Sequence, residues 1–167
     1  MKKISVLICL LWCFVACKKE GLMGYEGGNS IYMYIPGYWA FQSDTSIIDF
    51  TKSRVQQDTS LPLRFAIVGQ MASVDRPFKL LISDSSTAVV NRDYVLPPAD
   101  SFYIPADSIQ TTRHLRIKRS PDLKGKTVTL ILKLGSNEHF AANLPVNTSP
   151  VGNDPRSVTR LRVTIIQ

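Results

Sequence analysis

Apolar residues recur at every second position over much of the chain after residue 30, and this alternation limits the fold more than any other feature. The alternating runs are 61–68, 78–83, 114–118, 127–134 and 160–165. In each run one set of side chains is large and apolar, whereas the set between is mixed or polar. Because a period of two places successive side chains on opposite faces of an extended chain, each run predicts a half-buried β-strand.

Turn-forming residues separate these runs. They are Pro36-Gly37, Pro97-Pro98, Pro105, Ser120-Pro121-Asp122 and Gly152-Asn153-Asp154-Pro155. Turns of this kind typically join short strands, and no window shows the apolar three-four repeat of a long helix. The pattern therefore favours an all-β, antiparallel two-sheet sandwich with Greek-key connections.

The first residues are typical of an export signal. Two lysines precede an uncharged and almost wholly apolar stretch, 4–16, which is too short to cross a bilayer because crossing takes roughly 20 helical residues. The sequence Phe14-Val15-Ala16-Cys17 then resembles the lipobox of bacterial lipoproteins. We expect residues 1–16 to be removed as a signal peptide. The alternatives are a plain signal peptide and a buried N-terminal helix that happens to contain cysteines.

The cysteines favour a lipid-anchored protein. The chain has 3 cysteines, Cys9, Cys13 and Cys17, so cleavage would leave Cys17 alone to carry the lipid. Several acyl chains such as palmitate on one residue form a stable membrane anchor, since each buried methylene contributes about 0.8 kcal/mol. No disulfide, cysteine-bound metal or cysteine nucleophile would remain. Residues 17–30 predict a flexible tether, and residues 31–167 predict a single domain.

The charge of the chain says little about a ligand. Its formal net charge is +7, and loss of Lys2 and Lys3 with the signal would lower it to +5. The remaining cations are scattered along the sequence, and an exported protein meets no chromosome. We therefore expect no nucleic-acid partner and only a weak preference for anionic envelope surfaces or acidic glycans.

Several segments of the domain resemble Calx-beta-type sandwiches, in which a run of small residues precedes an Asp-Tyr pair and further short strands. The segments that carry the resemblance are Val74–Phe78, Ser86–Val95, Phe102–Ala106, Leu115–Ile117, Leu132–Leu134 and Asn137–Phe140. Together with the lipobox, they make the mature chain look like the Bacteroidetes lipoproteins grouped as domain of unknown function 4843. The resemblance implies an immunoglobulin-like, Calx-beta-like fold. It also implies a setting beside outer-membrane nutrient importers that handle glycans or peptides.

Asp93 and Tyr94, with Asp75, are interpreted as a structural motif. An Asp in a turn can accept hydrogen bonds from backbone N–H groups, and a Tyr can bury its ring while its hydroxyl finds a carbonyl. Calcium binding is the other possibility, but Ca²⁺ needs six to eight oxygen ligands. The aspartates are spaced singly, without an Asp-x-Asp cluster, so we predict no metal site.

The sequence offers little for catalysis. Its 2 histidines, His114 and His139, lie in neither a metalloprotease motif nor a nucleophile elbow. The glutamates are Glu20, Glu26 and Glu138, and no pair of acids is marked out for glycoside hydrolysis. We expect neither catalytic residues nor a cofactor.

Two groups of residues are candidates for binding a ligand. The aromatic segment Ile31–Phe41 includes Tyr38, Trp39 and Phe41, whose flat faces suit sugars. The alternative is that these rings belong to the first strand and its turn and are buried. The second group is basic and consists of Arg113, His114, Arg116, Lys118 and Arg119. Positions 114, 116 and 118 share one strand face, where they would either bind an anion or only face solvent.

From the lipobox, the strand pattern and the resemblance we expect a non-catalytic outer-membrane lipoprotein that serves as an accessory binding module of a nutrient uptake system. It would hold a glycan or peptide, or dock onto importer proteins of the outer membrane. Whether it faces the cell surface or the periplasm stays open. The alternative is a structural or adhesion module that makes only protein–protein contacts. A hydrolase is the third possibility, and for it we expect no turnover.

Overall fold

The computed structural model describes residues 27–36, 42–52, 58–144 and 159–167, and within them the chain forms strands and short 3₁₀ helices. The elements are β1 (Ser30–Pro36), β2 (Gln42–Ser43), β3 (Thr45–Asp49), β4 (Thr59–Val68), β5 (Arg76–Pro77), β6 (Lys79–Ile82), β7 (Tyr94–Val95), η2 (Ala99–Ser101), β8 (Tyr103–Ile104), β9 (Gln110–Ile117), η3 (Pro121–Leu123), β10 (Thr127–Gly135) and β11 (Arg160–Ile166). The signal peptide, Cys17 and most of the predicted tether lie outside the described residues.

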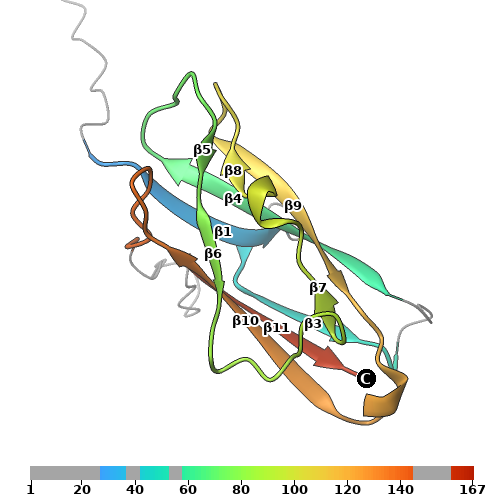
Figure 1. Ribbon diagram of the computed structural model, residues 1–167. Coiled ribbons are helices and arrows are strands. Elements are labelled where there is room, and N and C mark those ends of the chain that lie inside the picture. Colours follow the sequence, from blue (N-terminus) through green and yellow to red (C-terminus); the bar gives the residue numbers. More distant parts are fainter. Residues whose placement is uncertain (1–26, 37–41, 53–57, 145–158) are drawn as a thin grey trace, which may run out of the picture.

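The strands form two packed sheets (Figure 1). One has the order β2-β1-β4-β9-β7 and the other the order β3-β11-β10-β6, while β5 and β8 form a small separate pair. The paired strands are antiparallel, except that β3 runs parallel to β11. The all-β sandwich expected from the sequence is confirmed, with β3 as the exception to its antiparallel pairing.

The alternation in the sequence sets the two faces of each strand. In β4, Leu61, Leu63 and Phe65 are buried between the sheets, whereas Pro62 and Arg64 on the opposite face are only half-buried. Strands β10 and β11 alternate in the same way. Because burial of each such side chain contributes about 1.5–3 kcal/mol, the register that buries the apolar set is strongly favoured.

Aromatic rings close the core where β4 meets the segments around β5 and β8. Phe65 lies 4.6 Å from Phe78 and 6.1 Å from Phe102, measured between ring centroids, and the latter two rings are 5.8 Å apart. Edge-to-face and tilted contacts of this kind add about 0.5–1.5 kcal/mol each beyond burial. The cluster therefore fixes the small β5–β8 pair on the body of the sandwich.

Side-chain hydroxyls complete the edge of β10 beyond the end of β6. Ser86 Oγ accepts a hydrogen bond from the Ile131 N–H at 3.0 Å and lies 3.3 Å from the Ile131 carbonyl, to which it donates. Thr87 Oγ1 likewise accepts from the Thr129 N–H at 2.9 Å. The hydroxyls take the place of strand backbone groups, so this part of the edge is closed to further pairing.

The long axis of the sandwich has two distinct ends. At one, called here the N-terminal end, Asn29 accepts a hydrogen bond from the Gln70 N–H, and the loops 69–75 and 105–109 lie nearby. At the opposite, C-terminal end lie Asp58 and the last residue, Gln167 (Figure 1). Strand β4 connects the two ends over 10 residues, which corresponds to about 30 Å.

Candidate functional site

A polar hollow of about 660 Å³ lies on the outer face of the five-stranded sheet at the C-terminal end. It lies where β4 begins, β9 ends and the chain approaches η3. Its lining residues are Asp58, Thr59, Ser60, His114, Arg116, Arg119 and Pro121. Burial of Leu115 and Ile117 in the core turns the side chains of His114 and Arg116 outward, because successive strand residues point to opposite faces.

An ion pair forms one wall of the polar hollow. Asp58 Oδ2 lies 2.8 Å from Nε and 2.6 Å from Nη2 of Arg116, and Asp58 Oδ1 accepts from the Arg119 N–H at 3.3 Å. The Arg116 side chain is 65% exposed, so the pair contributes little to stability. It does hold a guanidinium beside the hollow, where a ligand can reach it.

A hydroxyl and an imidazole form another wall. Ser60 Oγ lies 3.1 Å from Nδ1 of His114, and both side chains are exposed. The lining thus offers two guanidinium groups, one carboxylate, hydroxyls and an imidazole. Such a set of donors and acceptors suits a ligand with hydroxyl or carboxylate groups, and the excess of guanidinium over carboxylate favours an anionic one.

An aromatic pair lies on the same outer face. The rings of Tyr32 and Tyr34 stack at 5.9 Å with an interplanar angle of 17°, and the guanidinium of Arg64 lies 5.9 Å from the Tyr34 ring. Burial raises the pKa of Tyr32, and the neighbouring Tyr34 raises it further. In the register of the sheet, Tyr34 pairs with Arg64, and two residues earlier on β4 Pro62 pairs with His114. The aromatic pair and the polar hollow therefore occupy neighbouring rows of one surface.

The structure divides the basic group named from the sequence. His114, Arg116 and Arg119 meet at the polar hollow. Arg113 faces the other way, with its guanidinium 5.1 Å from the Tyr103 ring and bonded to backbone carbonyls. Lys118 Nζ donates to the Asn91 carbonyl at 2.7 Å. Tyr38, Trp39 and Phe41, the aromatic candidates, lie outside the described residues.

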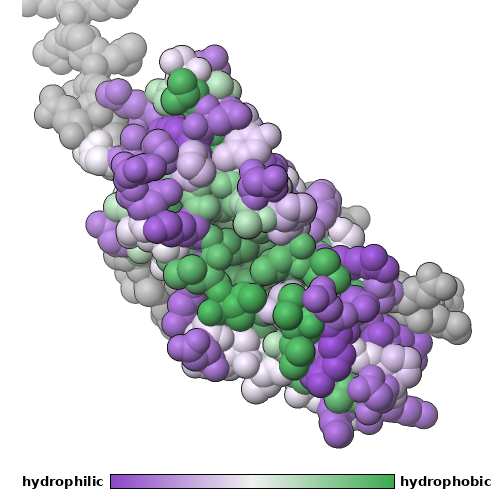
Figure 2. Space-filling view, viewed as in Figure 1, coloured by the Kyte–Doolittle hydropathy of each residue, from purple (hydrophilic) through white to green (hydrophobic). Residues whose placement is uncertain are grey.

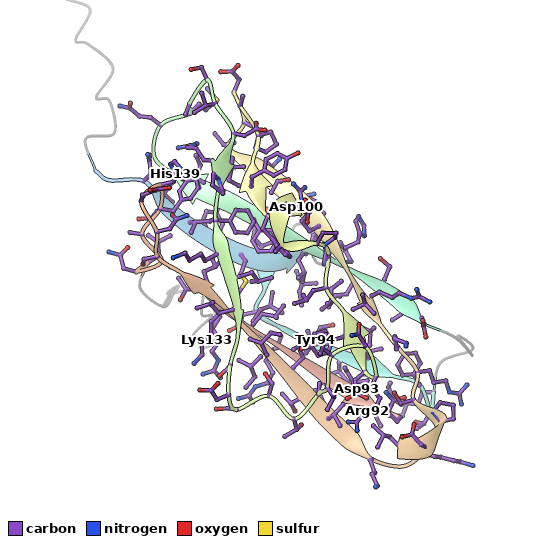
Figure 3. The ribbon with its side chains drawn as sticks, viewed as in Figure 1. Arg92, Asp93, Tyr94, Asp100, Lys133 and His139 are labelled. Atoms are coloured by element: carbon purple, nitrogen blue, oxygen red, sulfur yellow. The ribbon has the colours of Figure 1, made fainter. Side chains whose placement is uncertain are left out.

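Asp93 is a fully buried carboxylate near the C-terminal end (Figure 3). It accepts hydrogen bonds from the Val89 N–H at 2.7 Å, from Arg92 Nη2 at 2.9 Å and from Ser120 Oγ at 3.1 Å. Burial raises the pKa of this carboxyl, but the bonds from Arg92, Val89 and Ser120 outweigh it and hold the pKa below its ordinary value of 3.8. The arrangement closes the loop 89–93 on itself and joins it to Ser120, just before η3.

The other two groups of the expected structural motif also have defined places. Tyr94 is 2% exposed, and burial, followed by the nearby Asp93, raises its pKa. Asp75 lies at the N-terminal end, where its Oδ1 accepts from the Ala106 N–H at 2.8 Å. Within the described ranges no group of three or more His, Cys, Asp or Glu side chains is placed to hold a metal ion. In the same ranges no helix is long and apolar enough to cross a membrane.

A second surface is apolar. The side chains of Leu81 and Ile82 on β6, and of Val89 and Val90 before β7, are 50%, 41%, 46% and 50% exposed. Figure 2 shows apolar surface over this part of the molecule. We call these four residues the β6 apolar edge, because β6 is the last strand of its sheet among the described residues. Exposed apolar side chains on a sheet edge are typical of a protein contact.

Comparison with known families identifies the family to which the chain belongs. The model of the family described as Domain of unknown function (DUF4843) matches residues 25–150, so the protein belongs to this family, as its resemblance to those sequences implied. A search of the curated proteins gives no match.

Sequence reasoning missed several members of the outer face. Asp58 and Ser60 meet Arg116 and His114 only through the pairing of β4 with β9, and nothing local in the sequence indicates that pairing. Tyr32 and Tyr34, in contrast, belong to the aromatic segment Ile31–Phe41 that the sequence marked as a candidate, and they point outward because they alternate with the apolar residues of the first strand.

Proposed function

We propose that this protein is a non-catalytic lipoprotein of the outer membrane and an accessory binding module of a nutrient uptake system, with a glycan or peptide as its ligand. The lipobox at Phe14-Val15-Ala16-Cys17 supports the anchor. The polar hollow, with the Tyr32–Tyr34 pair in the neighbouring rows, carries the binding proposal.

The chemistry of this face supports an acidic or hydroxyl-rich ligand. Flat aromatic faces pack against the apolar faces of sugar rings, while guanidinium groups bind carboxylates through charge-assisted hydrogen bonds. Arg116 and Arg119 supply such groups at the polar hollow, with His114 and Ser60 as further partners for hydroxyls. We therefore expect acidic oligosaccharides to bind more tightly than neutral ones.

Calorimetric titration of the mature protein in detergent micelles tests this. The probes are oligogalacturonate, maltohexaose and trialanine, each applied to wild type, His114→Ala, Arg116→Ala and Trp39→Ala. Loss of one charge-assisted bond should weaken oligogalacturonate binding about tenfold in Arg116→Ala. Arg160→Ala is the matched control, because Arg160 is an exposed cation on the other sheet. Absence of saturable heat with every probe, or equal weakening by Arg160→Ala, would contradict binding at this face.

The β6 apolar edge favours one alternative, a structural or adhesion module that makes only protein contacts. An extended segment of a partner could add to the edge of β6 while its apolar side chains cover Leu81 and Ile82. In that case the titrations stay silent, and chemical cross-linking in intact cells gives a defined partner that is lost in Leu81→Lys. Ile47→Lys is the matched control, since Ile47 is 70% exposed on the opposite edge strand β3.

A further inference from the structure

Three large apolar side chains project from the loops at the N-terminal end. Met71 and Val74, between β4 and β5, are 62% and 60% exposed, and Ile109, just before β9, is 52% exposed. Figure 1 shows both loops together at the end of the molecule opposite the C-terminus. Single exposed apolar residues are ordinary on a protein surface, but three on adjoining loops at one end call for an explanation.

The two loops are tied to each other and to the body. The Asp107 N–H donates to the Ala72 carbonyl at 2.8 Å, and the Asp75 carboxylate accepts from the Ala106 N–H at the same distance. Arg76 Nη1 donates to the Gln70 carbonyl at 3.1 Å from its buried position. The loops are therefore held in one arrangement, and their apolar side chains cannot turn inward to the core without breaking these bonds.

The chain reaches the domain at this same end. Asn29 Oδ1 accepts from the Gln70 N–H at 3.1 Å. Only residues 18–28 separate Asn29 from Cys17, and covalent geometry limits the span of such a stretch to about 40 Å. A lipid on Cys17 would thus keep the exposed loops within a short distance of the bilayer that holds the lipid.

We propose that Met71, Val74 and Ile109 insert into the bilayer in which Cys17 is anchored, so that the N-terminal end rests on the lipid surface. This inference rests on the proposed lipid anchor. Tethering raises the effective concentration of the surface to the millimolar range, so even a weak contact is populated. The contact orients the domain and presents the polar hollow about 30 Å from the membrane, at the other end of β4.

The charges near the loops indicate which lipids suit them. Asp75 and Asp107 are both exposed in these loops, and carboxylates are repelled by an anionic surface. The contact should therefore be at least as strong with zwitterionic as with anionic lipid, although the net charge of the chain is positive.

A fluorescent probe on the loop tests the insertion. The lipidated protein is purified as Met71→Cys, whose thiol is free for labelling because Cys17 carries the lipid, and is labelled with an environment-sensitive nitrobenzoxadiazole dye. The matched control is Lys124→Cys at the C-terminal end, where Lys124 is exposed. In phosphatidylcholine vesicles, emission at position 71 should rise several-fold, shift to the blue and be quenched by spin-labelled acyl chains. Position 124 should show none of these changes.

Each outcome has a defined meaning. Flotation with the vesicles and a silent probe at position 71 would overturn the insertion while leaving the anchor intact. Failure of the labelled and unlabelled proteins to float would overturn the anchor and the insertion with it. A response at position 71 that appears only at high protein-to-lipid ratio would assign the loops to contacts between copies, against the proposal. A stronger response with phosphatidylglycerol vesicles would contradict the role given to Asp75 and Asp107.

Discussion

The two ends of the sandwich each hold a buried charged side chain, and the fold treats the two differently. At the C-terminal end, the carboxylate of Asp93 accepts hydrogen bonds from Val89, Arg92 and Ser120. At the N-terminal end, Arg76 is 4% exposed and donates from Nη1 to one backbone carbonyl. Within the described part of the chain, its Nε and Nη2 are buried and have no hydrogen-bond partner.

The difference lies in how the loss of hydration is offset. For Asp93, hydrogen bonds from separate segments replace water. For Arg76, the remaining compensation is the face of the Phe140 ring, 4.9 Å from the guanidinium carbon. Because a buried donor without a partner costs about 1–3 kcal/mol, the charge at one end stabilises the fold and the charge at the other is kept at a cost.

The largest expected effect is at Asp93. Asp93→Ala should lower the free energy of unfolding by about 2–4 kcal/mol, because the donors at Val89 and Ser120 lose their acceptor, and an unmatched buried donor costs about 1–3 kcal/mol. The Arg92 side chain is 41% exposed, so its charge can be hydrated instead. Urea denaturation followed by circular dichroism measures this. Asp84→Ala, at an exposed carboxylate, is the control and should change the value by less than about 0.5 kcal/mol. A loss below about 1 kcal/mol in Asp93→Ala would contradict the claim that this carboxylate stabilises the C-terminal end of the sandwich.

Arg76 should respond in the opposite sense when its shape is kept. Arg76→Met retains a long side chain over Phe140 while removing the unpartnered donors, so stability should stay equal or rise by about 1 kcal/mol. Arg76→Ala opens a void and should cost about 2 kcal/mol or more. The same denaturation assay compares them. If both substitutions cost the same, the charge itself is needed at that end.

Two glycines allow a smaller test of how tightly each end is built. Gly69 has φ +142°, and a Cβ there would clash with Asn29 Oδ1, so Gly69→Ala should cost about 2 kcal/mol through strain and the displaced side chain. Gly125 has φ +76° with open space around it. Gly125→Ala should therefore cost only the strain of holding a non-glycine residue at a positive φ, about 1 kcal/mol. Equal losses in thermal unfolding would mean that the Asn29 contact is dispensable.

The smallest effect is the pH dependence of the stabilisation by the Asp93 carboxylate. Since the pKa of Asp93 lies below 3.8 in the folded protein, the folded state binds a proton less readily than the unfolded chain does. The contribution of Asp93 to the free energy of unfolding is complete above about pH 5. It is lost as the pH falls through the pKa of the folded state, at up to about 1.4 kcal/mol per pH unit. Denaturation midpoints at pH 6 and pH 3 measure the loss. Asp93→Asn should show a smaller loss; an equal one assigns the acid sensitivity to other groups.

The strands could be predicted because their signal is local. In β4, β10 and β11, alternation between core and surface residues places each side chain without knowledge of its neighbours. The parallel pairing of β3 with β11 could not be predicted, since Thr45–Asp49 has no buried alternating face. Strand β3 pairs with the edge of β11 that β10 does not cover, and the location of that edge depends on the pairing of β10 with β11.

The candidate site could be predicted only in part, because some of its contacts join residues that are far apart in the sequence. The outward direction of His114 and Arg116 follows from strand alternation, but Asp58 meets Arg116 across a separation of 58 residues. Arg113 shows that neighbouring charges in the sequence do not by themselves predict a shared site. It shares the inward face of β9 with Leu115, and it stays half-buried because carbonyls and the Tyr103 ring surround its guanidinium.

Labelling of Cys17 tests the central claim most directly. Cells that express the wild-type chain or Cys17→Ala are grown with radiolabelled palmitate, and the protein is followed through membrane fractionation. The account predicts label in the wild-type protein, none in the variant, and release of the variant from the membrane fraction. Palmitate in the Cys17→Ala protein, or an unlabelled wild-type chain, would contradict the lipid anchor on which the proposed function and the orientation of the domain depend.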